Sequence, residues 1–141
     1  MSQFISTSLQ ETEQFGLRFA QSLKGGEVIA MYGGMGMGKT AFTRGLACGL
    51  GIASGVSSPT FALVHEYQGR LKVYHFDMFR VNGWDDLYST GFFDYLDTEA
   101  VLVIEWSENI EEALPKACIK IHVETGQNEN ERIFTIEGGV L

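Results

Sequence analysis

Eight residues from Gly33 to Thr40 form a pattern that binds phosphate groups. They read Gly-Gly-Met-Gly-Met-Gly-Lys-Thr and satisfy the P-loop motif G-x-x-x-x-G-K-[ST]. Glycines let the backbone fold into a nest of inward-pointing N–H groups, and the following helix directs its positive N-terminal dipole at the same anion. The motif predicts that Lys39 contacts the β- and γ-phosphates of ATP, or the β-phosphate of ADP, and that the Thr40 hydroxyl binds Mg²⁺. The residues expected to bind the nucleotide here are Gly33, Gly36, Met37, Gly38, Lys39, Thr40 and Ala41.

A second phosphate-binding pattern overlaps the first. Residues 36–41 also fit the dinucleotide fingerprint G-x-G-x-x-[GA]. That fingerprint requires an acidic residue about 20 positions further on, at the end of a second parallel strand. Residues 56–62 read Val-Ser-Ser-Pro-Thr-Phe-Ala and contain no acid, so the dinucleotide interpretation fails.

Two carboxylates follow apolar segments of strand length. Asp77 comes after residues 73–76, and Glu105 comes after the uniformly apolar residues 101–104. A P-loop site needs an acid at the end of a neighbouring strand to hold Mg²⁺ directly or through water. The apolar run is typical of a central buried strand and favours Glu105 for this position. In a paired arrangement one carboxylate would hold Mg²⁺ and the other would orient water.

Two further residues are candidates with competing explanations. Thr60 ends a Ser-Ser-Pro-Thr segment about 20 residues after Lys39, where P-loop proteins often place a hydroxyl that senses the γ-phosphate. A plain Ser-Pro turn before a strand explains this segment equally well. Trp106 follows Glu105 directly, and its residue type favours a core position.

The histidines and cysteines show no spacing typical of a metal site or a catalytic triad. His65, His75 and His122 fall in strand-like segments, where packing in the sheet is expected. Cys48 and Cys118 are isolated in the sequence, so we expect both to be reduced and to lie in or near the core.

The pattern of apolar residues predicts one α/β domain over residues 1–141. A helix should begin near Ser8, because Ser8 and Glu11 have capping-box spacing, and end at Gly25-Gly26. The other predicted elements are helices at 40–50 and 107–114, short helices within 84–96, and strands at 28–32, 60–67, 71–77, 101–104, 119–125 and 132–137. The expected fold is a three-layer P-loop NTPase-like domain with a central mixed sheet flanked by helices.

Composition restricts the functions that the chain can have. The net charge is −8, and the ten Lys and Arg residues form no basic run, so direct binding of nucleic acid through a basic face is not expected. The longest apolar runs are far shorter than the roughly 20 residues that span a bilayer. The N-terminal residues have no features of a secretory signal, and we expect a cytoplasmic location.

These landmarks together resemble the bacterial TsaE family, the ATPase component of tRNA threonylcarbamoyladenosine biosynthesis. The resemblance covers nearly the whole chain and includes residues 11–16, the P-loop, 58–64, 73–80, 104–106 and 121–123. It implies ATP hydrolysis within a complex with two further proteins, TsaB and TsaD. That complex would support modification of adenosine 37 in certain tRNAs, and this chain would meet tRNA only through its partners.

The resemblance also implies roles for individual residues. These are Thr40 and Glu105 as Mg²⁺ ligands, Asp77 and Trp106 as residues needed for activity, and Ser8 and Arg132 on the outer side of the nucleotide. One position departs from the family pattern, which commonly has a second Thr after the Lys-Thr pair. Here that position is Ala41, so the role of the hydroxyl is absent or is taken by Thr43 or Thr60.

A P-loop does not by itself distinguish an ATPase from other nucleotide-binding proteins. The chain lacks an Asn-Lys-x-Asp element for guanine, and it is short for the insertion and lid arginines of a small-molecule kinase. The remaining alternative is a docking module that binds ATP and hydrolyses little or none. Asp77 and Glu105 favour hydrolysis, whereas the missing arginine finger favours slow turnover without a partner.

Overall fold

A mixed β-sheet forms the centre of the molecule. The computed structural model describes residues 2–33, 38–52, 64–96 and 98–138. Within these residues seven strands form one sheet in the order β1-β7-β6-β2-β5-β4-β3. The strands are β1 (Ser2–Ser6), β2 (Val28–Tyr32), β3 (Val64–Tyr67), β4 (Val73–Asp77), β5 (Val101–Glu105), β6 (Ile119–Thr125) and β7 (Arg132–Glu137). The central strands β6, β2, β5 and β4 are parallel, and the outer three pair antiparallel to their neighbours.

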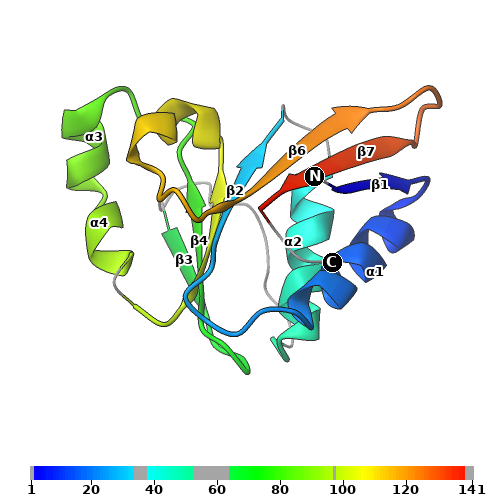
Figure 1. Cartoon of the computed structure of the whole chain (residues 1–141), viewed down its shortest axis with the longest axis horizontal. Helices are drawn as coiled ribbons and strands as arrows, with labels where there is room; N and C mark the ends of the chain where they lie inside the picture. Colours follow the sequence, from blue (N-terminus) through cyan, green and yellow to red (C-terminus); the bar gives the residue numbers. More distant parts are fainter. Residues whose placement is uncertain (1, 34–37, 53–63, 97, 139–141) are drawn as a thin grey trace.

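Helices cover both faces of this sheet (Figure 1). Helices α1 (Leu9–Ala20) and α2 (Lys39–Gly49) pack together on one face. The other face carries α3 (Trp84–Ser89), α4 (Phe92–Tyr95) and the 3-10 helix η1 (Ser107–Ala113). The three-layer α/β fold with a mixed central sheet, expected from the sequence, is therefore confirmed.

The two faces of the sheet follow from the alternation of side chains along each strand. All five residues of β2 and of β5 are buried, as expected for central parallel strands covered on both sides. Ile29, Val101 and Val103 belong to the core under α1 and α2. Ala30, Leu102 and Ile104 belong to the second core, under α3, α4 and η1. The position of any residue in β4 or β5 thus determines which layer its side chain meets.

Close packing of α1 against α2 depends on glycines. A β-carbon at Gly45 would collide with the Glu13 carbonyl group, and one at Gly16 would collide with the Phe42 carbonyl oxygen. The sequence pattern treats internal glycines as a weakness of the second helix. The structure shows instead that they allow its backbone to approach α1.

The observed elements differ from the predicted ones in three places. Strand β1 was not predicted, and the first helix ends at Ala20 with Gln21 as its C-cap, before the glycine pair. The region after Trp106 is a 3-10 helix, whereas the short helices expected within 84–96 are confirmed. Residues 60–63 of one predicted strand lie outside the described part of the chain. Among the described residues, the helices are too short or too polar to cross a membrane.

Candidate functional site

The connection from β2 to α2 places Lys39 at the edge of the sheet. Gly33 follows β2 with a φ of 137°, and Gly38 caps α2 with a φ of 93°, both in a region that side-chain-bearing residues rarely adopt. This strand–loop–helix order is the structural context that the P-loop motif requires. Gly36 and Met37, also expected to bind nucleotide, lie outside the described residues.

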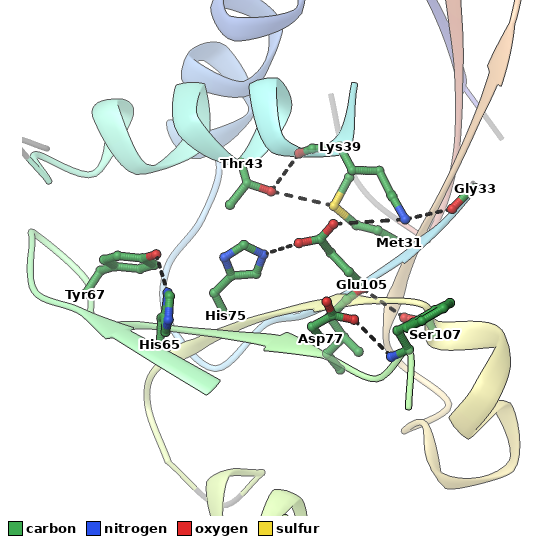
Figure 2. Close-up of polar contacts among 12 residues, drawn as sticks. Met31, Gly33, Lys39, Thr43, His65, Tyr67, His75, Asp77, Glu105 and Ser107 are labelled. Carbon is green, nitrogen blue, oxygen red and sulfur yellow. Dashed lines mark hydrogen bonds and ion pairs between the residues drawn. The ribbon is translucent and has the colours of Figure 1, made fainter. Parts of the chain in front are cut away.

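The Lys39 side chain is buried among three groups (Figure 2). Its Nζ donates a hydrogen bond to the Gly33 carbonyl oxygen at 2.7 Å and lies 4.0 Å from a Glu105 carboxylate oxygen. The same nitrogen lies 4.8 Å from the centre of the Trp106 ring, within the range of a cation–π contact. The structure therefore brings three of the expected site residues, Lys39, Glu105 and Trp106, into contact.

The two candidate carboxylates lie side by side at the carboxyl ends of their strands. Asp77 ends β4 and pairs in parallel register with Glu105 at the end of β5. Asp77 Oδ1 accepts a hydrogen bond from the Phe79 backbone N–H at 2.9 Å. Burial is the main cause that raises the pKa of Asp77, with a smaller contribution from the nearby Glu105 charge. The paired arrangement expected from the sequence is present.

His75 is a member of this cluster that the sequence analysis assigned to sheet packing. It is fully buried on β4, and its Nε2 lies 2.7 Å from Glu105 Oε2 (Figure 2). His75 is buried in the sheet as expected, and it also contacts Glu105 because alternation along β4 turns residues 73, 75 and 77 toward the α2 layer. Glu105 faces the same layer on the adjacent strand, so strand alternation together with pairing of these two segments would have placed the residues together.

Trp106 does not occupy the core position that its residue type favoured. Its ring is partly exposed and lies 4.9 Å from the ring of the exposed Phe79, measured between centroids. Its backbone adopts a left-handed conformation with a φ of 58°. Among the described residues, Trp106 is the single non-glycine residue with a positive φ. Such strained backbone conformations cluster at functional sites, because the surrounding structure must hold them in place.

The outer side of the loop is formed by residues distant in sequence. A β-carbon built at Gly38 would lie 3.8 Å from Arg132 Cγ and 4.0 Å from Thr12 Cγ2. Arg132 begins β7, and Thr12 lies in the first turn of α1, where its hydroxyl donates to the Ser8 carbonyl oxygen at 3.2 Å. The Ser8 hydroxyl itself caps α1 by accepting from the Glu11 backbone N–H at 3.1 Å. Arg132 and the N-terminus of α1 thus flank the start of α2.

Comparisons with known proteins identify the family to which this arrangement belongs. A family model described as threonylcarbamoyl adenosine biosynthesis protein TsaE matches residues 6–134. The chain belongs to the TsaE family. The match includes the P-loop, both carboxylates, Trp106 and Arg132.

Individual relatives support the same assignment. A protein of Treponema pallidum named tRNA threonylcarbamoyladenosine biosynthesis protein TsaE is 36% identical over 129 residues, which cover 92% of this chain and 96% of the relative. A Bacillus subtilis protein with the same name is 38% identical over 131 residues, covering 92% of this chain and 82% of the relative. The crystal structure of Bacillus subtilis YdiB is similar with a TM-score of 0.80 and 32% identity, covering 96% of this chain and 83% of that one.

The residues after Lys39 show which hydroxyls this TsaE family member can offer. Thr40 is the second residue of α2 and is partly exposed, and Ala41 is buried. Thr43 is buried, and its Oγ1 donates to the Lys39 carbonyl oxygen at 2.9 Å within the helix. That bond holds the Thr43 hydroxyl in the helix, so the structure gives no support to Thr43 as the replacement at Ala41. Thr60, the other candidate, lies outside the described residues.

Other polar features of the described chain lie apart from this site. A cavity of about 290 Å³ between α3 and η1 is lined in part by Glu108, Glu111 and Glu112, which would repel phosphate. No group of three His, Cys, Asp or Glu side chains in the described residues is arranged to hold a metal ion. Both cysteines are free, as expected, but Cys48 is exposed rather than near the core.

Proposed function

We propose that this chain binds ATP with Mg²⁺, hydrolyses it slowly, and acts in tRNA threonylcarbamoyladenosine biosynthesis together with TsaB and TsaD. The family assignment supports the pathway, because the curated relatives carry that name. The geometry at the end of β2 supports nucleotide binding. The observation that carries the proposal is the buried Lys39 ammonium beside Glu105 at the start of α2.

The side chains present fit a magnesium nucleotide. Carboxylate and hydroxyl oxygens are ligands that Mg²⁺ prefers, and it usually takes only one or two from protein while phosphates and waters supply the rest. Glu105 and Thr40 would provide those two ligands. Bound Mg²⁺ would neutralise negative charge on the phosphate oxygens.

The protein residues divide the remaining tasks by their position. Lys39 would exchange its contact with the Gly33 carbonyl oxygen for the stronger charge of the β- and γ-phosphates. Asp77 would hold a water molecule, because a carboxylate that already accepts the Phe79 N–H can accept further hydrogen bonds. Trp106 and Phe79 would cover the site and exclude bulk water from it.

A docking module that binds ATP without appreciable turnover is the alternative function. Arg44 could not serve as an arginine finger from its observed position, since its guanidinium pairs with Glu13 at 2.9 Å on the exposed side of α2. Steady-state phosphate release distinguishes the two functions. Release above background that Glu105→Gln abolishes supports the ATPase, and release at background supports the docking module.

Substitution of Lys39 tests the nucleotide site directly. Lys39→Ala should reduce affinity for ADP and ATP at least a hundredfold, because the substitution removes a buried cation from the phosphate site. Isothermal titration calorimetry measures both affinities. The matched control is Lys72→Ala, which removes an exposed lysine that directly precedes β4 and pairs with Glu66, and it should bind ADP like the parent. Equal affinity of Lys39→Ala and the parent would show that the phosphate lies elsewhere.

A further inference from the structure

His75 is a buried polar side chain with one occupied and one vacant hydrogen-bonding nitrogen. The residue is 0% exposed, and Nε2 lies 2.7 Å from Glu105 Oε2. Nδ1 is also buried and has no hydrogen-bond partner among the described residues. A buried nitrogen without a partner lowers stability, so an imidazole fills this space less favourably than an apolar side chain of similar size.

The contact with Glu105 fixes which ring nitrogen carries a proton. A carboxylate oxygen accepts hydrogen bonds, so Nε2 must donate. In a neutral imidazole Nδ1 is then the acceptor that lacks a partner. A ring that donates a hydrogen bond from one nitrogen to a carboxylate orients that carboxylate. Side chains that coordinate metals are commonly oriented by such hydrogen bonds.

The two oxygens of Glu105 therefore face different neighbours. Oε2 receives the His75 hydrogen bond, and Oε1 lies 4.0 Å from Lys39 Nζ at the start of α2 (Figure 2). Without the hydrogen bond, the carboxylate could rotate about its terminal bond, because that torsion is broad and weakly restrained. His75 thus selects one orientation of the Glu105 side chain before any ligand arrives.

We propose that His75 is a positioning residue, which holds Oε2 of Glu105 so that Oε1 is directed at the Mg²⁺ of a bound nucleotide. This inference rests on the proposed function, because it gives His75 a role only through Glu105. It differs from a packing role in its effect on Mg²⁺ binding. Removing the imidazole takes the His75 donor away from the buried Glu105 Oε2 and should lower the free energy of unfolding in either case, whereas only a positioning role predicts that the gain in affinity due to Mg²⁺ also falls.

Two substitutions at position 75 separate the donor from the bulk of the side chain. His75→Leu fills the space without a donor, whereas the side-chain amide of His75→Gln reaches about as far as Nε2 and can donate to Glu105. His65→Leu is the matched control, because His65 is the register partner of His75 on β3 and bonds with Tyr67 rather than Glu105. Urea unfolding of all four proteins checks that each is folded.

The test compares ADP affinity in EDTA with ADP affinity in excess Mg²⁺, measured by isothermal titration calorimetry. In His75→Leu we expect the gain in affinity due to Mg²⁺ to fall at least tenfold, while affinity in EDTA stays at the parent value. His75→Gln and His65→Leu should retain the parent gain within about threefold. The proposal is overturned if His75→Leu keeps the full gain or if His75→Gln loses as much as His75→Leu.

A measurement on the parent protein covers the case in which a variant does not fold. Nitrogen-15 NMR of the imidazole should show a proton on Nε2 of His75, and Glu105→Gln should shift that signal. Absence of the Nε2 proton would refute the proposal without reference to any nucleotide. Failure of the proposed function is distinct, since the parent itself would then bind no ADP or gain no affinity from Mg²⁺.

Discussion

At the scale of single residues, the site is defined by the groups that surround the Lys39 ammonium group. Lys39 is buried between the Gly33 carbonyl group, the Glu105 carboxylate and the Trp106 ring. These contacts satisfy the ammonium group in the absence of phosphate. A nucleotide must therefore compete with them, and its binding should change the environment of each.

Trp106 offers a direct measurement of that change. In a Trp84→Phe background, saturating ADP with Mg²⁺ should alter Trp106 emission, because Lys39 leaves the ring for the phosphates. The control is the Trp106→Phe variant, which retains Trp84. It should respond less, since Trp84 lies on α3, on the face of the sheet opposite to α2. Fluorescence titration measures both. An unchanged Trp106 signal, under conditions where calorimetry shows ADP bound, would contradict the observed contact.

Part of this site could be predicted from the sequence. The P-loop spacing identified Lys39, and the apolar runs before Asp77 and Glu105 identified strands that end in carboxylates. The place of His75 could not be read from residue type alone, because it depends on pairing between two segments 30 residues apart. Trp106 was misplaced for a related reason, since residue type does not reveal a left-handed backbone at the end of β5.

At the scale of elements, local signals predicted most helices and strands but not their partners. Strand β1 was missed because Ser2–Ser6 has only two apolar residues, and its pairing with β7 crosses nearly the whole chain. The same pairing of distant segments places Arg132 beside Gly38. Long-range strand pairing is thus the information that the local patterns do not contain.

The start of α1 gives a pH-dependent prediction. Hydrogen bonds from the Thr7 hydroxyl and then the Thr7 backbone N–H lower the pKa of Glu11. A lowered pKa in the folded state adds stability above the ordinary pKa and loses it as the pH falls through the folded value. Glu11→Gln should therefore unfold at lower urea than the parent at pH 7, and the difference should shrink as the pH falls below the ordinary pKa of a glutamate and vanish once Glu11 is protonated in the folded state. Glu124→Gln, an exposed change on β6, controls for charge; a difference independent of pH would contradict the capping role.

The packing of α1 on α2 gives a second prediction at this scale. Gly45→Ala improves helix propensity by about 1 kcal/mol but forces a methyl group into the Glu13 backbone. Because the opposing atoms are backbone, the collision should dominate and destabilise the fold by about 1–3 kcal/mol. Arg44→Ala, on the exposed side of the same helix, should cost less than about 1 kcal/mol. Urea unfolding measures both, and a stable Gly45→Ala protein would show that the helices can separate.

At the scale of the whole molecule, the net charge bears on how the chain would associate with a partner. The chain carries a charge of −8. Among the described residues, Lys39 is the buried lysine or arginine at the site. Phosphoryl transfer places negative charge on the γ-phosphate oxygens, and efficient enzymes supply a further cation, often an arginine from a partner. An acidic chain of this kind is suited to associate with a partner surface of opposite charge.

We therefore expect the isolated protein to hydrolyse ATP slowly and TsaB with TsaD to raise its turnover at least tenfold. Because charge attraction assists association, raising salt from about 50 mM to about 300 mM should weaken that stimulation more than it changes the activity of the isolated chain. Steady-state phosphate release at saturating ATP measures all four conditions. Lys39→Ala with both partners is the control for ATPase activity that comes from elsewhere. Fast turnover by the isolated chain that TsaB and TsaD leave unchanged would show that its own residues complete the site. Stimulation that does not depend on salt would show that apolar contacts govern the association with the partners.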